Sequence, residues 1–307
     1  MIIQLTLADL ANWAPGDISE FYFGITRNGH YLDGNDEVRA RLEEAVEQYG
    51  SRMQKRLIRN NHQNHLSAEL RKYLTTIVCN RYTYEEIMCI ICKPSCLMIE
   101  NLPYESDVYR SIIGTYVSDP KYKNLFRKLD GAQNRGWLTF LHAGGFGPMK
   151  PLMEYYDKRD YKNVADKKIA VLMDRDTDSP TKMPTSRNPF FRLLSGKTVG
   201  TVVNGDIYSL SQNVYVWHMW YKRAIENYFP AAQYDNLGYP SNTAPTVPAD
   251  WSYKDLGKIN RYGKSHLFDV SVGMSRSAYE ANCTQFAIGG ESMSEMQLFL
   301  LKLVKLI

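Results

Sequence analysis

Residues 169–173 read Ile-Ala-Val-Leu-Met, an unbroken apolar run that is followed closely by Asp174, Asp176 and Asp178. A short apolar run with β-branched residues is typical of a strand buried on both faces, as in the middle of a parallel sheet. Because the acids alternate, an extended chain would carry the side chains of Asp174 and Asp176 on the same side. The pattern therefore predicts a central strand whose carboxyl end is acidic.

Two further apolar runs precede this strand in the chain. Cys96–Ile99 ends on Glu100, and Trp137–Leu141 ends shortly before Gly144 and Gly145. Helical patterns separate the three runs. Alternation of strands and helices predicts right-handed crossovers and a parallel sheet whose strand ends share one edge. We therefore predict that Glu100, the two glycines and the acids after residue 173 meet there.

The first 95 residues show a different pattern. Asn28 and Gly29 lie between the apolar segments 21–25 and 30–32 and predict the turn of a β-hairpin. Helices are predicted from Asn35 and Asp36 through Val46, from Ser67 through Thr76, and from Thr83 through Ile91. Because the region holds no cluster of acids, we expect it to serve docking or assembly and not chemistry.

Polar and basic segments lie between and after the predicted core elements. Residues 118–136 and 179–205 are interpreted as polar insertions, and residues 238–248 as a linker. Loops at the carboxyl edge of such a sheet carry function, so their cations can grip a phosphate backbone. These cations are Lys121, Lys123, Arg127, Lys128 and Arg135 in the first insertion, and Lys182, Arg187, Arg192 and Lys197 in the second. Beyond the linker the chain is predicted to be mainly helical and to end in a helix over 296–307.

Composition narrows the class of protein. The chain has 307 residues, of which 44% are hydrophobic and 12% aromatic, as is ordinary for a globular protein. A formal charge of +4 and a pI near 8.6 permit nucleic-acid binding without requiring it. No apolar run approaches the ~20 residues that cross a bilayer, and no secretory signal pattern opens the sequence. We expect a cytoplasmic protein without membrane contact and, since its 5 cysteines are an odd number, with reduced thiols.

The acids after residue 173 admit two interpretations. Asp residues are common after strands because Asp caps the following helix and tolerates turn conformations. Carboxylates at the carboxyl edge of an open parallel sheet also lie where such sheets place ligands, and hard divalent cations prefer oxygen ligands. The ligand interpretation needs Glu100 at the same edge. Without a cation, these acids would repel one another and raise some of their own pKa values.

The order of these motifs resembles the Toprim domain that topoisomerases, bacterial primases and several nucleases share. In that family a Glu follows the first strand, glycines follow the second and Asp-x-Asp follows the third, as do Glu100, Gly144–Gly145 and Asp174–Asp176 here. Many members have Gly after the Glu, where this chain has Asn101. The match predicts a Toprim-like core.

A second segment narrows the resemblance. Trp217–Phe229 contains Arg-x-Ile-Glu-Asn-Tyr at residues 223–228 and is similar to the same segment of Toprim nucleases of the overcoming-lysogenization-defect type. In those relatives the Glu of this segment helps to hold a second metal ion, a role that the resemblance gives to Glu226. The resemblance covers about residues 96–230. It implies an α/β fold in which a Toprim-like parallel sheet is flanked by helices, between a mainly helical N-terminal region (1–95) and a helical C-terminal cap (231–307).

The activity that the resemblance implies is hydrolysis of phosphodiester bonds in DNA or RNA, tRNA included, by an endonuclease that uses Mg²⁺ or Mn²⁺. Two such ions can activate a water on one side of the phosphorus and stabilise the leaving oxygen on the other. The implied catalytic residues are Glu100, Asp174, Asp176 and Glu226, which with Asp178 are also the implied metal ligands. The implied substrate-binding residues are Gly144, Gly145, Lys222 and Arg223.

The resemblance also bears on partners. Relatives act as toxic effectors in anti-phage defence and often work with an ABC-type ATPase encoded nearby, and the interpretation allows a homo-oligomer. Two alternatives stay open: a catalytically silent Toprim-fold scaffold, and an activity of the topoisomerase or primase type. His142 and His218 are interpreted as structural because two-metal hydrolysis needs neither.

Overall fold

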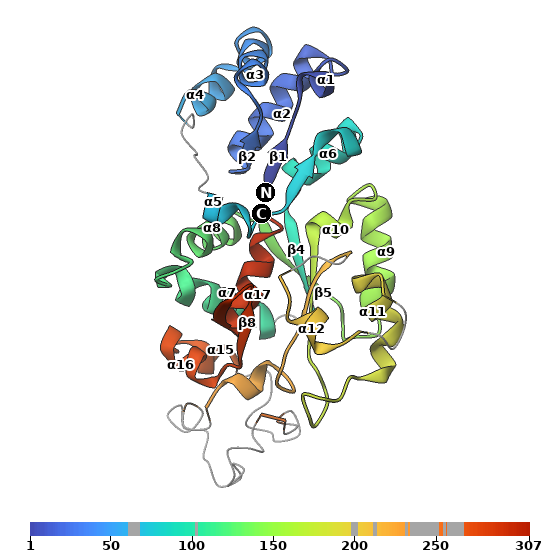
Figure 1. Cartoon of the computed structure of the whole chain (residues 1–307), viewed down its shortest axis with the longest axis vertical. Coiled ribbons are helices and arrows are strands. Elements are labelled where there is room, and N and C mark those ends of the chain that lie inside the picture. The colour runs from blue at the N-terminus through green and yellow to red at the C-terminus, as the bar shows by residue number, and fades with distance from the viewer. Residues whose placement is uncertain are drawn as a thin grey trace.

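The structure is a computed structural model that describes residues 1–60, 68–101, 104–197, 202–210, 214–230, 233, 252–253, 256 and 267–307. In this part of the chain helices flank two parallel sheets, of three and four strands, and a two-stranded antiparallel sheet lies near the C-terminus. Figure 1 shows the N-terminal region stacked on the larger sheet, with both ends of the chain between them. The predicted α/β class with parallel sheets flanked by helices is confirmed.

The larger sheet contains the predicted acidic strand. It consists of β4 (Ser95–Ile99), β5 (Leu138–His142), β6 (Ile169–Met173) and β7 (Val216–Met219) in the order β5-β4-β6-β7, and every neighbouring pair is parallel. β4 and β6 lie in the middle and are buried along their whole length, which explains their continuous apolar sequences. The pattern predicted β4, β5 and β6 but not β7. β4 begins one residue before the predicted core at residue 96.

Helices lie on both sides of this sheet (Figure 1). They include α7 (Tyr104–Thr115), α8 (Lys123–Asn134), α9 (Met149–Arg159), α10 (Ala165–Lys168) and α11 (Asn188–Ser195). Helix α8 corrects the prediction that residues 118–136 are a polar insertion. Its Leu125, Phe126 and Leu129 are buried at helical spacing, so the segment is part of the core.

The N-terminal region is built around a small sheet of its own. Strands β1 (Ile2–Gln4), β2 (Tyr31–Asp33) and β3 (Thr76–Val78) pair in parallel in the order β2-β1-β3. The helical elements around them are α1 (Leu7–Leu10), α2 (Pro15–Arg27), α3 (Asp36–Tyr49), α4 (Arg52–Asn60), α5 (Ala68–Arg71), η1 (Cys79–Arg81) and α6 (Tyr84–Cys92). Helix dominates the region, as predicted, but the sheet was not predicted.

The predicted hairpin at residues 21–32 is wrong. Pro15 starts helix α2, which buries Ile18, Phe21 and Ile25, a spacing that suits a helix and not a strand. Gly29 has φ 68° and turns the chain directly after the helix, so the Asn-Gly pair ends a helix and does not join two antiparallel strands. β2 then pairs in parallel with β1.

Of the three helices predicted in this region, two are confirmed and one is wrong. α3 is confirmed, with the side chain of Asn35 accepting a hydrogen bond from the N–H of Val38 at 2.9 Å. α6 is confirmed as well, with Thr83 as its cap. The helix predicted from Ser67 through Thr76 is wrong in most of its length: Ser67 lies outside the described residues, α5 is short, and Thr76 starts β3.

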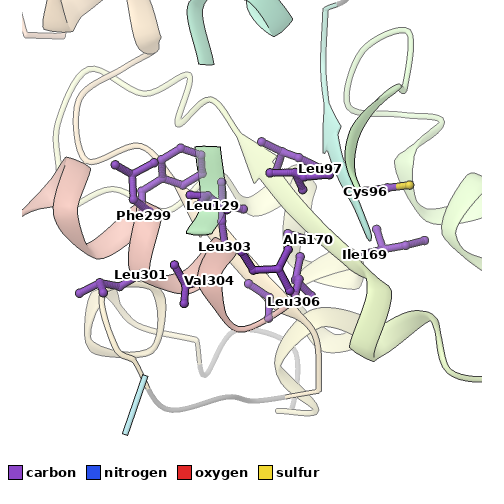
Figure 2. Packing of buried hydrophobic residues seen from close by; sticks show 14 of the residues in the cluster. Cys96, Leu97, Leu129, Ile169, Ala170, Phe299, Leu301, Leu303, Val304 and Leu306 are labelled. Atoms are coloured by element: carbon purple, nitrogen blue, oxygen red, sulfur yellow. The ribbon is translucent and has the colours of Figure 1, made fainter. Parts of the chain in front are cut away.

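The C-terminal region supplies part of the core. After η4 (Ile225–Tyr228), its described elements are α15 (Leu267–Ser271), α16 (Arg276–Asn282), the antiparallel strands β8 (Gln285–Ile288) and β9 (Glu291–Ser294), and α17 (Glu295–Val304). Every residue of α17 except Gln297 is buried. Figure 2 shows its apolar side chains gathered with those of β4 and β6 in one cluster. The predicted terminal helix is therefore confirmed, and it is a core element; the antiparallel pair was not predicted.

Three further predictions concern the polar insertion at 179–205, the linker at 238–248 and the cysteines. The interpreted insertion 179–205 contains η3 (Thr185–Arg187), α11 and the start of α12 (Asn204–Ile207), while residues 198–201 and the interpreted linker 238–248 lie outside the described residues. None of the helices that the structure describes is both long and apolar enough to span a membrane. All five cysteines are free thiols, as expected.

Candidate active site

Glu100 and Asp174 meet at the carboxyl edge of the larger sheet. Glu100 follows β4 and Asp174 follows β6, and these two strands are hydrogen-bonded neighbours. The N–H of Asp174 donates to Oε1 of Glu100 at 3.2 Å. Both residues are buried, with 9% and 6% of their surface exposed. The predicted meeting of the first acid with the Asp-x-Asp turn is present in the structure.

The glycine turn after β5 reaches the same edge. Gly144 and Gly145 have φ 71° and 102°, a region that other residues rarely adopt. The N–H of Gly145 donates to the main-chain oxygen of Glu100 at 2.9 Å. The turn therefore places glycine backbone, with no side chain, beside the buried acid.

Asp176 is held by its backbone. It has φ 55°, a left-handed conformation that Asp tolerates better than most residues, and its side chain is 49% exposed. The carbonyl of Arg223 accepts from the N–H of Arg175 at 2.8 Å and from that of Asp176 at 3.0 Å. Arg223, predicted to bind substrate through its side chain, thus supports the acidic turn through its main chain.

Arg175, which separates Asp174 and Asp176 in the chain, is fully buried. Its guanidinium donates to the carbonyls of Trp220 at 3.1 Å, Pro180 at 2.9 Å and Lys182 at 3.1 Å, and to the hydroxyl of Tyr208 at 2.6 Å. These bonds tie the loop after β6 to the end of β7. Arg175 therefore fixes the path of the loop that follows Asp176.

Arg187 is the cation that faces the acids. Its guanidinium donates to Oε1 of Glu100 at 3.3 Å, to the main-chain oxygen of Asp174 and to Oδ2 of Asp176. It is buried, and it lies over the ring of Phe146, 4.5 Å from the ring centre. The sequence predicted Arg187 only as one of several loop cations able to grip a phosphate backbone; the structure directs it to the carboxylates.

Glu226 and Asp174 both act electrostatically on the hydroxyl of Tyr109. Burial raises the pKa of the Tyr109 hydroxyl well above its usual value, and the negative charges of Glu105, Asp174 and Glu226 raise it further. Glu226 is buried on η4, and Glu105 is buried in the first turn of α7. Sequence analysis missed Tyr109 and Glu105, although Glu105 lies in the helix that follows Glu100.

Two predicted site residues have other partners. Nζ of Lys222 donates to the carbonyl of Asn227 at 3.0 Å and lies 5.1 Å from the ring centre of Tyr228, and burial lowers its pKa. Asp178 is exposed and accepts from Nζ of Lys182 at 2.8 and 3.1 Å. The structure therefore shows Lys222 supporting its own loop and Asp178 paired at the surface.

A buried network supports the segment that carries Glu226. Glu295, at the start of α17, accepts from the N–H of Tyr221 at 2.6 Å and from the hydroxyl of Tyr228, and Nε2 of His218 lies 3.1 Å from its Oε1. Burial raises the pKa of Glu295 to about 7 and lowers that of His218. The expected structural role of His218 fits this buried position.

Three acids of this edge are candidate ligands of a divalent ion. Glu100, Asp174 and Asp176 supply the hard oxygen donors that Mg²⁺ and Mn²⁺ prefer. Among the described residues, however, no three His, Cys, Asp or Glu side chains are arranged to hold a metal ion. The guanidinium of Arg187 stands in for a cation by contacting Glu100 and Asp176 together. The donor chemistry fits a divalent ion, provided that Arg187 withdraws.

Comparison of the chain with protein-family models, with curated proteins and with solved structures found no match. The Toprim resemblance therefore rests on the motifs alone.

Proposed function

We propose that the protein is a Mg²⁺- or Mn²⁺-dependent nuclease whose active site is the carboxyl edge of the larger sheet. The observation that carries the proposal is the hydrogen bond from the N–H of Asp174 to Glu100, which joins acids 74 positions apart in the chain. The bond uses the main chain of Asp174, so it fixes the carboxylate of Glu100 beside the first residue of the Asp-x-Asp turn. The position also matches the general placement of ligands in open parallel sheets.

The roles of the residues follow from their positions. Glu100, Asp174 and Asp176 would hold the first ion, and Glu226 would help to hold the second. When bound, the ions would supply an activated water and stabilise the leaving oxygen. The glycine turn at Gly144 and Gly145 leaves room for a backbone phosphate beside Glu100.

In this proposal Arg187 binds a phosphate of the substrate. A guanidinium binds carboxylates and phosphates through the same forked pair of N–H groups. With Glu100 and Asp176 engaged as ligands of an ion, Arg187 would be free to donate the same hydrogen bonds to a phosphate at this edge. This gives Arg187, and not Lys222, the predicted part of a phosphate-binding cation.

A second candidate function is a catalytically silent scaffold. The ion pairs of Arg187 with Glu100 and Asp176 favour it, because they neutralise the acidic edge with a side chain of the protein itself. In a scaffold this arrangement would be permanent and no ion would bind. A topoisomerase or primase activity has no comparable observation in its favour.

Cleavage assays separate these functions. The purified chain is incubated with supercoiled plasmid, total RNA and tRNA, in Mg²⁺, Mn²⁺ or EDTA. We expect metal-dependent cleavage that Asp174→Asn reduces by ~10²-fold or more, with Asp178→Asn as the matched control that leaves cleavage intact. A wild type that cleaves nothing with either ion supports the scaffold, and equal activity of Asp174→Asn and wild type removes the proposed site.

The biological setting is proposed from the resemblance. We infer an effector of anti-phage defence that an ABC-type ATPase encoded nearby restrains or activates, with the N-terminal region as a docking surface. Affinity purification from cells that express the neighbouring genes tests this partnership. A protein that is fully active alone and never retains an ATPase would refute it.

A further inference from the structure

A cavity of about 230 Å³ lies at the opposite end of β4 from Glu100. Its lining includes Ser95, the first residue of β4, and Lys168, which directly precedes β6. Ser95 and Glu100 are five positions apart along this strand, a span of about 17 Å. In Figure 1 the two ends of the chain meet in this region, and Ile307 belongs to the lining. The cavity is therefore separate from the candidate active site.

The lining of this cavity is basic. Among the described residues it contains Lys93, Lys128, Arg135 and Lys168 and no Asp or Glu side chain. Lys168 is buried and donates to the carbonyl of Ile90 at 2.9 Å. Lys128 is intermediate in overall exposure, yet its Nζ is shielded from solvent and lies beside the Met1 amino group. Four cations of the described part of the chain thus line one small space.

Lys128 has two basic neighbours. The Met1 amino group raises the pKa of Lys128 through a hydrogen bond, whereas the positive guanidinium of Arg135 lowers it. Burial is the main cause that lowers its pKa to about 7, and burial lowers that of Lys168 to about 8. The ring of Tyr31, with its centre 4.2 Å from Nζ, faces the ammonium. A buried cation costs stability unless an anion pairs with it.

We propose that this cavity binds a small phosphate-bearing anion, with Lys128 and Lys168 contacting its oxygens and Arg135, exposed at the rim, closing over it. Anions pair with buried ammonium groups through short, charge-assisted hydrogen bonds. The volume is below the roughly 300 Å³ at which cavities begin to take whole drug-sized ligands. It therefore suits phosphate, pyrophosphate or the terminal phosphates of a nucleotide. The inference does not depend on the nuclease proposal.

Binding is measured by titration calorimetry on the full chain with an unmodified N-terminus, using inorganic phosphate, pyrophosphate and ATP as probes. The test variant is Lys128→Met, and the matched control is Lys123→Met, which removes an exposed lysine from the same helix. Loss of one buried charge partner should weaken binding by about 30-fold or more, whereas the control should bind like the wild type. Since Lys128→Met removes a costly buried charge, we expect it to fold and to melt no lower than the wild type.

The outcomes are distinct. Tightest binding of phosphate or pyrophosphate identifies a free anion as the ligand, and tightest binding of ATP identifies a nucleotide. Either result supports the proposal if the Lys128→Met variant loses the binding. Failure of all three probes at millimolar concentration would overturn it, as would equal binding by Lys128→Met and wild type. Selective binding of a 5′-phosphorylated oligonucleotide, with none of the small anions, would overturn it in favour of a nucleic-acid end.

Discussion

Arg187 donates a hydrogen bond to Glu100 across 3.3 Å, although 87 positions separate the two residues in the chain. Their side chains are only 4% and 11% exposed. The same guanidinium reaches Asp176, so one buried cation joins the acid after β4 to the turn after β6. This contact neutralises part of the acidic edge and makes Arg187 the competitor of any divalent ion there.

Replacement of Arg187 by Met should therefore have two opposite effects. Removing one partner of a buried ion pair leaves Glu100 uncompensated, so without metal the free energy of unfolding should fall by on the order of 3 kcal/mol. With Mg²⁺ or Mn²⁺ the stabilisation should be larger than in the wild type, because the competing cation is gone. Thermal melts of both proteins, in EDTA and in each metal, measure the two effects.

Arg192→Met is the control for this experiment. Arg192 lies on α11, a little more than one turn after Arg187, and is exposed. Its removal should change neither the melting temperature in EDTA nor the shift caused by metal. An Arg187→Met protein that behaves like this control would show that Arg187 does not hold the acids together.

The acids themselves should stabilise the metal-free protein. Repulsion among them alone would make Glu100→Gln neutral or stabilising, but Arg187 lies against Glu100 and reverses this expectation. We expect Glu100→Gln to lower the free energy of unfolding by about 1 to 2 kcal/mol in EDTA, whereas the exposed Asp178→Asn should leave melting unchanged. A double-mutant cycle with Arg187→Met measures the coupling directly. A coupling energy of zero would contradict the ion pair.

The two central strands of the larger sheet were predictable for a simple reason. A strand buried on both faces must be apolar throughout, so β4 and β6 are visible in the sequence as short apolar runs. Their order along the chain, with helices between them, then placed Glu100 and Asp174 at one edge. This part of the candidate site followed from local patterns and connectivity alone.

The wrong hairpin prediction and the unpredicted position of Arg187 also have physical causes. Asn28 and Gly29 favour a tight turn, and that local chemistry is shared by hairpins and by the ends of helices. Only burial of Ile18, Phe21 and Ile25 on one helical face decides between them. Arg187 could not be placed because its position depends on the path of the loop from residue 176 onward, which Arg175 fixes through main-chain carbonyls.

Glu295 should make stability depend on pH. Its folded-state pKa is raised from 4.5 to about 7, so between these values the unfolded chain has released the proton that the folded protein keeps. At this group the folded state binds more protons, so the contribution of Glu295 to stability should fall as pH rises through this window, while His30 and His218, whose pKa values burial lowers, act in the opposite sense. Glu295→Gln should remove this fall, which amounts to roughly 3 kcal/mol. Urea unfolding of both proteins between pH 4.5 and 7.5 measures it.

Glutamine keeps the geometry of the site in this comparison. Its amide oxygen can accept from the N–H of Tyr221, as the carboxylate does, and its NH₂ can donate to the hydroxyl of Tyr228. A pH profile of Glu295→Gln with the same slope as the wild type would show that another group causes the dependence. Lys302 does not produce it, because burial lowers its pKa to about 7 and its effect lies above that pH.

Sulfate binding at the basic cavity should weaken as pH rises from about 6 to 8.5. The cause is loss of the positive charge of Lys128, because burial lowers its pKa to about 7. Sulfate keeps its own charge over this range, which phosphate does not. The titratable groups of the described residues near Nζ include Tyr31, His30, Arg135 and the Met1 amino group. Burial holds the pKa of the amino group well below 8.0 and that of His30 well below 6.5, so neither adds a charge change near neutral pH.

The expected loss of affinity is about 30-fold, because a group with this pKa goes from mostly charged to almost wholly neutral in that interval. Lys168 titrates near 8 and should leave a smaller dependence in Lys128→Met, while Lys123→Met should follow the wild-type curve. Calorimetric titrations of sulfate at several pH values give these curves. Because an anion raises the pKa of the lysine it pairs with, binding should also take up protons, so the measured heat should vary with the ionisation enthalpy of the buffer. A wild-type affinity that is constant across this range, with no proton uptake, would mean that Lys128 does not contact the anion.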